Sequence, residues 1–272
     1  MSGEWSDLLS KGYLVLPDFL ERPEIEHLLR EFRALPNAAN ANYKVKRVST
    51  ATLEKFKSKL AHVSKSVLEH TGIQTDVCTG ALFFAVEMGI NFDWHQDHES
   101  YYEYQDHFNY LHFYIPIQKP VRETTNMSLV PLDRFSAFDP AASLDRVGRG
   151  ACRAFVKNGK TDFLDDNDGR KFSSSMNFDE VAVTPQLGEG DLLIMRGDVF
   201  HKTQDIHTER IAVSFRAVNS NGLIRKKDLR ITCQAKDIMM KNNPTKFRVL
   251  EEYFAKSEHE EIAVKDYLPL RR

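Results

Sequence analysis

The chain has 272 residues, and its 37 Lys and Arg residues against 39 Asp and Glu residues give a formal net charge of −2. With 42% hydrophobic and 28% charged residues it has the composition of a folded globular protein, which excludes general disorder. The near-zero charge argues against nucleic-acid binding through a broad basic face, and no run of apolar residues reaches the roughly 20 that a membrane helix needs.

The first 75 residues or so are predicted to be mainly helical. They begin without the basic and apolar regions of a signal peptide, so we expect a cytoplasmic protein. A short apolar strand at 12–17 precedes a helix in which Pro23 lies in the first turn and apolar residues follow at helical spacing. A longer helix is expected over 51–71, because its apolar residues form one stripe and Gly72 can end it.

Between about residues 78 and 220 the pattern changes to short strand-like runs separated by turn residues, which is typical of a β-sandwich or barrel. The expected strands are 81–87, 108–117, 127–132, 181–185, 191–195 and 210–218. The polar stretch at about 133–180 shows little regular pattern, and we interpret it as a lid-like insert.

A helical C-terminal tail is expected over about 221–272, with an amphipathic helix from about 246. Because a β-barrel or sandwich of roughly 200–250 residues commonly forms one unit, we expect a single domain over 1–272.

Histidine, and not cysteine, is the candidate metal-binding residue type. The three cysteines, at positions 78, 152 and 233, are too few and too far apart for a disulfide framework or a cysteine zinc site. Six of the ten histidines, in contrast, lie between positions 95 and 207. Any metal chemistry would therefore use nitrogen and oxygen ligands.

Two possible metal ligands lie close together in the segment 91–100. If this segment is extended, His95 and Asp97 point to the same face and can offer a nitrogen and an oxygen to one metal. Chance supplies about 1.4 such His-X-acid pairs in a chain of this composition, and two others begin at His207 and His259. The pair therefore needs support from other residues.

Two later residues supply that support. His201 follows a turn, an apolar strand and a second turn, and Arg210 begins another strand nine residues later. Two histidines and one carboxylate on one side of a metal form the ligand set of non-haem Fe(II) oxygenases, which leaves positions for a chelating co-substrate and dioxygen. A dianionic 2-oxo acid would also need a fixed cation, and the planar guanidinium of Arg210 suits its far carboxylate.

The run 108–117 suits a barrel around a polar site. Tyr110, His112 and Tyr114 share one face of this expected strand, while apolar residues share the other face. We take Tyr110 as a further candidate for cofactor binding.

Four segments together resemble a known family. They are Trp94-His-Gln-Asp97, Gly190-Asp-Leu-Leu-Ile194, His201-Lys-Thr203 and Arg210-Ile-Ala-Val-Ser214. In their order and spacing they resemble the phytanoyl-CoA dioxygenase-like family of Fe(II)/2-oxoglutarate-dependent oxygenases, as does the opening segment 12–20. The resemblance covers roughly 10–35, 80–132 and 185–219. It implies a mainly β fold with flanking α-helices around a double-stranded β-helix (jelly-roll, cupin-like) core.

The resemblance also implies roles for individual residues. It assigns iron to His95, Asp97 and His201, the 5-carboxylate of 2-oxoglutarate to Arg210, and further contacts with this co-substrate to Gln96 and Thr203.

Three residues are candidates for substrate contact. They are Arg216, His112 and Tyr101. Arg216 shares a strand face with Arg210, but six residues at about 3.3 Å each separate them by roughly 20 Å, so both cannot reach one small anion. The spacing from His201 favours Arg210 for the co-substrate, which leaves Arg216 to contact substrate or to form a surface ion pair.

We therefore expect an Fe(II)/2-oxoglutarate-dependent dioxygenase that uses O2 to hydroxylate or otherwise oxidise a C–H bond, with release of succinate and CO2. The expected substrate is a small organic molecule such as a specialised metabolite, and no nucleic-acid or membrane partner is expected. Two alternatives remain open, a Jumonji-like protein side-chain hydroxylase and a non-catalytic binding module on the same fold.

Overall fold

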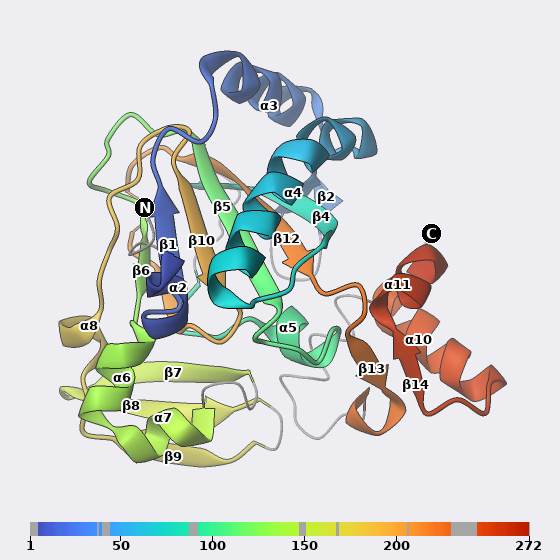
Figure 1. The fold of residues 1–272 in the computed structure, drawn as a ribbon. Coiled ribbons are helices and arrows are strands. Elements are labelled where there is room, and N and C mark those ends of the chain that lie inside the picture. Colours follow the sequence, from blue (N-terminus) through green and yellow to red (C-terminus); the bar gives the residue numbers. More distant parts are fainter. Residues whose placement is uncertain are drawn as a thin grey trace.

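The computed structural model describes residues 5–36, 38–39, 44–86, 92–146, 151–166, 169–205, 207–229 and 244–271 (Figure 1). The helices are α2 (Asp7–Ser10), α3 (Arg22–Ala34), α4 (Thr50–Thr71), α5 (His98–Tyr102), α6 (Leu132–Phe138), α7 (Pro140–Arg146), α8 (Phe178–Val181), η2 (Lys226–Leu229), α10 (Pro244–Lys256), α11 (Val264–Tyr267) and η3 (Leu268–Arg271). None of these described helices combines the length and apolar character needed to cross a membrane.

The strands are β1 (Tyr13–Leu16), β2 (Ala38–Ala39), β3 (Lys44–Arg47), β4 (Val77–Ala85), β5 (Tyr110–Gln118), β6 (Met127–Leu129), β7 (Cys152–Lys157), β8 (Lys160–Asp165), β9 (Lys171–Ser174), β10 (Leu192–Arg196), β11 (His201–Thr203), β12 (Ile211–Val218), β13 (Leu223–Arg225) and β14 (Glu261–Ala263). Seven of them form one antiparallel sheet in the order β1-β10-β5-β12-β4-β3-β2.

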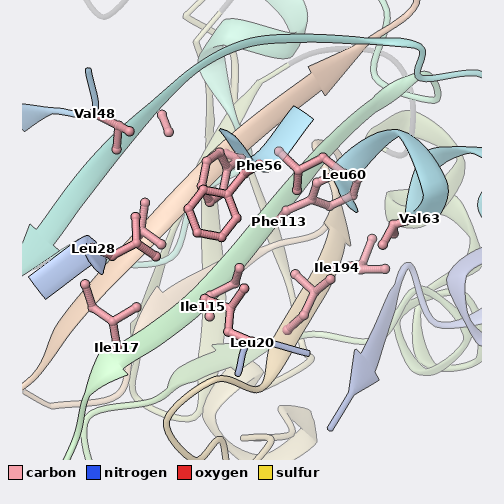
Figure 2. Packing of buried hydrophobic residues seen from close by; sticks show 14 of the residues in the cluster. Leu20, Leu28, Val48, Phe56, Leu60, Val63, Phe113, Ile115, Ile117 and Ile194 are labelled. Carbon is pink, nitrogen blue, oxygen red and sulfur yellow. The ribbon is translucent and has the colours of Figure 1, made fainter. Parts of the chain in front are cut away.

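Helices α3 and α4 cover one face of this larger sheet. Figure 2 shows Phe56 and Leu60 of α4 packed against Phe113 and Ile115 of β5, with Ile194 of β10 beside them. The interface is dry, because every one of these side chains is at most 4% exposed. This apolar contact fixes the helices on one face of the sheet and leaves the opposite face for the site.

The ends of both helices follow from local sequence. In α3, the side chains and backbones of Glu21 and Glu24 form a capping box, and a proline lies in the first turn. The side chain of Ser49 caps α4, which ends at Gly72 in the left-handed conformation (φ 74°). Both predicted helices are therefore confirmed.

The second face of the larger sheet looks onto a smaller layer. Tyr114 of β5 and Ala212 of β12 pack with Leu129 of β6 in a buried cluster, whereas the neighbouring Phe113 and Val213 belong to the core under the helices. The predicted alternation of the two faces is confirmed, and the mainly β, jelly-roll-type fold with flanking helices is as expected.

In the smaller layer, the segment around His95 connects the β6–β11 pair with the sheet of β7–β9. β6 pairs with β11, and β7, β8 and β9 form a three-stranded sheet. His95 is bridged to His201 of β11 on one side and to Arg153 of β7 on the other. The backbone of the His95 segment also bonds β7, since Gln96 N donates to Cys152 O at 3.0 Å.

The stretch 133–180 differs from its expected irregular pattern. It holds α6, α7, β7–β9 and α8, packed around Phe135, Phe163 and Phe178 and against Trp94 and Phe200. Its strands are short and rich in polar residues, so they carry no clear apolar alternation. Positions 147–150 and 167–168 of the insert lie outside the described residues.

Two expected strands are also shorter or absent among the described residues. The strand predicted at 127–132 ends at Leu129, because Pro131 precedes α6. In place of a strand at 181–185 there is the end of α8 and a single bridge from Val183 to Leu129.

The C-terminal part packs beside α5. The predicted amphipathic helix is α10, and β13 and β14 pair next to it. Phe254 of α10 and Tyr267 of α11 are buried with Tyr104 and Tyr110. Residues 230–243, with the third cysteine, lie outside the described residues.

Candidate metal and co-substrate site

Three predicted ligand residues converge in the interior. His95 and Asp97 lie in the extended segment before α5, and His201 is the first residue of β11. One possible ligand atom from each of the three residues lies within 4.8 Å of the other two. His95 and Asp97, which share one face of their segment, thus lie next to His201 on a strand that is distant in sequence.

Hydrogen bonds orient both imidazole rings. Nδ1 of His95 lies 2.7 Å from Asp93 O, and Nδ1 of His201 lies 2.9 Å from Val199 O, so each Nδ1 donates to a carbonyl oxygen. Each ring therefore keeps Nε2 as its available lone pair. The two histidines also exchange backbone bonds of 3.0 and 3.1 Å, which fixes their separation.

Burial shifts the pKa values of all three ionisable groups. Burial lowers the pKa of His95 well below its ordinary value and that of His201 to about 4, so both rings are neutral at pH 7. Burial raises the pKa of Asp97 to about 8, against the opposing effect of Arg216. A bound cation would replace the Asp97 proton, and this donor set of two imidazoles and one carboxylate fits Fe(II).

A chain of polar contacts leads from Asp97 away from the ligands. Nε2 of His112 lies 3.1 Å from Asp97 Oδ2, and the Tyr110 hydroxyl lies 3.3 Å from the same Nε2. The Tyr110 hydroxyl also donates to Glu99 Oε2 at 3.0 Å. The structure thus places His112 and Tyr110 beside the candidate ligand Asp97 and the half-buried Glu99, at the α5 end of β5.

Arg210 is buried near several polar side-chain atoms that have no hydrogen-bond partner among the described residues. It is 2% exposed, and its Nη1 donates to Thr125 O at 3.3 Å, while its Nε has no hydrogen bond to a described residue. The hydroxyl groups of Tyr114 and Ser214 are buried and likewise lack described partners. Tyr114 and Ser214 face each other across β5 and β12.

Tyr114 and Ser214 were not predicted as site residues. Strand alternation was the available signal, because Ser214 has the same parity as Arg210 and Tyr114 the same parity as Tyr110. Burial raises the pKa of Tyr114, and the nearby Arg210 opposes this shift, which places the phenol close to the guanidinium. The three groups form a buried set of donors that suits a carboxylate.

Lys119 closes the same end of the site. Its Nζ donates to Arg122 O at 2.7 Å, Asn126 Oδ1 at 2.5 Å and Leu187 O at 2.9 Å. Burial, followed by the charge of Arg210, lowers its pKa to about 8. All three of its donors are occupied, so Lys119 shapes this end of the pocket instead of offering a free ammonium.

The two predicted helper residues are placed differently. Thr203 is two residues from His201 on β11, shares its face and is 6% exposed. Gln96 lies on the other side of its segment from His95, and its Nε2 donates to Asp198 O at 2.7 Å. The structure therefore brings Thr203, and not Gln96, to the face that carries the histidine ligands.

Arg216 is not at the surface. Its Nε lies 3.0 Å from Glu99 Oε2, and its side chain is 13% exposed. Nζ of Lys246 on α10 contacts the same glutamate at 2.8 Å. Of the two alternatives left open for Arg216, the structure shows an ion pair, but this pair is not at the surface, because α5 and α10 cover the end of β12. Tyr101, on α5, stacks on His107 with ring centroids 5.2 Å apart.

Comparisons with known proteins place this geometry in context. The family model for phytanoyl-CoA dioxygenase matches residues 8–214. A comparison with curated protein sequences finds no match.

Solved structures share the fold at low sequence identity. The α-ketoglutarate-dependent epimerase SnoN from nogalamycin biosynthesis has a TM-score of 0.55 and 14% identity, over 82% of this chain and 84% of that chain. EvdO2 from Micromonospora carbonacea var. aurantiaca, complexed with 2-oxoglutarate, has a TM-score of 0.51 and 12% identity, over 80% and 90%. A prolyl-4-hydroxylase from Pseudomonas putida has a TM-score of 0.50 and 10% identity, over 80% and 98%.

Proposed function

The chain belongs to the phytanoyl-CoA dioxygenase family of iron- and 2-oxoglutarate-dependent oxygenases, and on this premise we propose that it oxidises a C–H bond of a small organic substrate. Hydroxylation is the simplest such reaction, with succinate and CO2 as co-products. The observation that carries the proposal is the convergence of His95, Asp97 and His201 within 4.8 Å.

We assign the metal to these three residues. Nε2 of each histidine and the Asp97 carboxylate would hold Fe(II) on one face and leave its other positions for small ligands. Bound iron, together with 2-oxoglutarate, supplies the activation of dioxygen. Asp97 contributes the negative charge that offsets part of the metal's charge, and the carbonyl oxygens of Asp93 and Val199 hold the rings in place.

We assign the far carboxylate of 2-oxoglutarate to the Arg210 pocket. Arg210 would neutralise its charge, and the Tyr114 and Ser214 hydroxyls would donate to its oxygens. Binding would thus satisfy buried polar groups that have no described partner, which is favourable because an unsatisfied buried donor is costly. Thr203 is the further candidate contact on the histidine face.

A small-molecule substrate is supported by relatives of the same fold. SnoN has been crystallised with Fe3+, α-ketoglutarate and nogalamycin RO.

We further propose that the chain works as one domain and that the insert at 133–180 covers the site as a packed wall, since β7 bonds to the His95 segment. The cytoplasmic location stays a prediction from the sequence.

The test is anaerobic titration followed by turnover. Protein with Fe(II) should develop a visible charge-transfer band when 2-oxoglutarate is added, and with air it should release succinate when a substrate is present. His95→Ala and Asp97→Ala should abolish both signals, whereas His62→Ala, at an exposed position of α4, should leave both unchanged. Normal signals in the two ligand variants would overturn the assignment.

A screen separates the substrate classes. Small metabolites and peptides should be offered in parallel, with succinate release as the common readout. Release with small molecules alone supports the proposal. Release that requires a peptide would instead support a protein side-chain hydroxylase.

A further inference from the structure

The face that carries the histidine ligands continues beyond them. His95 is bridged to His201 on one side and to Arg153 on the other. Side chains of residues that oppose each other on neighbouring strands point to the same face, so Arg153 lies beside His95 on the ligand face. Helices α6 and α7 lie over the other face of β7–β9, where the cluster around Phe163 is buried (Figure 1).

Alternate residues of β7–β9 form an uncovered surface, which we call the open face. It consists of Arg153, Phe155 and Lys157 of β7, Lys160, Asp162 and Leu164 of β8, and Lys171 and Ser173 of β9. All of these side chains are exposed or half-exposed, whereas most of the intervening residues are buried. The open face is therefore a solvent-accessible extension of the metal site's own face.

The open face is cationic although the chain as a whole is slightly acidic. It carries four basic residues and one acidic residue, Asp162, which accepts a hydrogen bond from Ser173 Oγ at 2.5 Å. Its lysines form no ion pair within the described part of the chain. Lys157 and Lys160 lie directly opposite each other, which is unfavourable for like charges. An anion on this face would relieve that repulsion.

Arg153 is held ready at the end of the open face nearest the metal. Both oxygens of the fully buried Asp166 lie within 3.1 Å of its Nε, and Asp166 is fixed in turn by His98 at 2.6 Å. The two Nη nitrogens form no hydrogen bond to a described residue, and 40% of the side chain is exposed. A fixed, planar pair of donors of this kind matches a carboxylate or a phosphate.

We propose that the open face binds the substrate and that the substrate carries a carboxylate or phosphate group, which Arg153 holds beside the metal. This proposal rests on the function proposed above. The lysines attract the anion as it approaches, and Phe155, 41% exposed, offers apolar surface to the rest of the molecule. Arg153 and Lys157 are four residues apart, or about 13 Å along the strand, which is the length of a small organic molecule.

Fluorine NMR tests the proposal with three matched probes. They are 4-(trifluoromethyl)benzoate, 4-(trifluoromethyl)phenyl phosphate and the neutral 4-(trifluoromethyl)benzamide. Excess 2-oxoglutarate fills the Arg210 pocket in every sample. Line broadening in metal-free protein reports binding, and additional broadening with Mn(II) reports proximity to the His95 site.

The anionic probes should bind at least about fivefold more tightly than the amide, and only they should show additional broadening with Mn(II). Arg153→Gln should weaken their binding about tenfold, and Lys157→Gln, at the exposed end of β7, by a smaller factor that vanishes at high salt. Lys57→Gln on α4, 69% exposed, is the matched control and should have no effect. The tighter of the two anionic probes identifies the anionic group.

Equal binding of the anionic and neutral probes, or unchanged binding in Arg153→Gln, would overturn the proposal. Failure of Mn(II) to bind would instead overturn the metal assignment, while the metal-free measurement would still decide on the open face. The two failures are therefore distinguishable.

Discussion

Replacement of Arg210 by glutamine should weaken 2-oxoglutarate binding strongly. The side chain is 2% exposed, its Nη1 donates to Thr125 O, and its Nε has no hydrogen-bond partner among the described residues, so the buried guanidinium keeps a donor for an anion. Removing one member of a buried charge pair costs about 3–5 kcal/mol. Taking about 3–4 kcal/mol, the dissociation constant should rise by about 140- to 700-fold, because each 1.4 kcal/mol is a factor of ten.

Two companion variants set the scale for this effect. Tyr114→Phe removes a neutral donor whose loss costs about 0.5–1.5 kcal/mol, so the dissociation constant should rise only about two- to tenfold. Arg216→Gln should change it by less than that, because Arg216 pairs with Glu99. Arg22→Gln, at a position 66% exposed, should be silent.

The assay is anaerobic titration of the Fe(II) protein with 2-oxoglutarate, followed by the visible absorbance of the complex. Circular dichroism of each variant would verify that the fold is kept. A dissociation constant for Arg210→Gln within threefold of the native value would refute the reasoning. A large effect in Arg216→Gln together with a small one in Arg210→Gln would move the carboxylate to the other end of β12.

Three further predictions concern protonation, packing and the buried charges. Because the pKa of Asp97 is about 8 without metal and binding needs the carboxylate, Co(II) affinity should rise about tenfold per pH unit from pH 6 to 8 and level off above; a flat profile would contradict this. Phe56→Ala should lower the free energy of unfolding by about 3–5 kcal/mol in urea titrations, against less than about 0.5 kcal/mol for the 46%-exposed Leu68→Ala. Glu103→Gln removes the buried charge that Lys246, Arg271 and Tyr267 contact and should cost about 3–5 kcal/mol, with faster hydrogen exchange in α10, whereas the exposed Glu251→Gln should not.

The candidate ligands could be predicted because their pattern is local. His95 and Asp97 are two residues apart on an extended segment, and His201 follows a recognisable turn and strand. To bring His201 next to this segment, the fold only has to pack the strand of His201 against the His95 segment. Helix α4 was equally predictable, because the stripe of apolar residues along it and the glycine that ends it lie within one continuous segment of sequence.

What the sequence did not predict depends on distant partners. Arg216 is largely covered from solvent (13% exposed), because it shares an ion-pair cluster with Glu99 of α5, more than 100 residues before it, and Lys246 of α10, 30 residues after it. The strands of the insert are short, and their pairing with the His95 segment has no counterpart in the local pattern. Ser214 could have been predicted, since the strand alternation that places Arg210 inside the barrel also places Ser214 there.

The bonds that join β7 to the metal-bearing segment suggest how this enzyme could acquire new substrates. Gln96 N donates to Cys152 O, and Ala154 N donates to Trp94 O, and the side chains of Trp94, Cys152 and Ala154 pack in the buried cluster around Phe163 and not on the open face. Side chains that point to the open face can therefore vary without displacing His95. Directed evolution confined to the open-face positions would thus sample new specificities while leaving the proposed iron ligands in place, and this separation makes the insert a natural place for divergence.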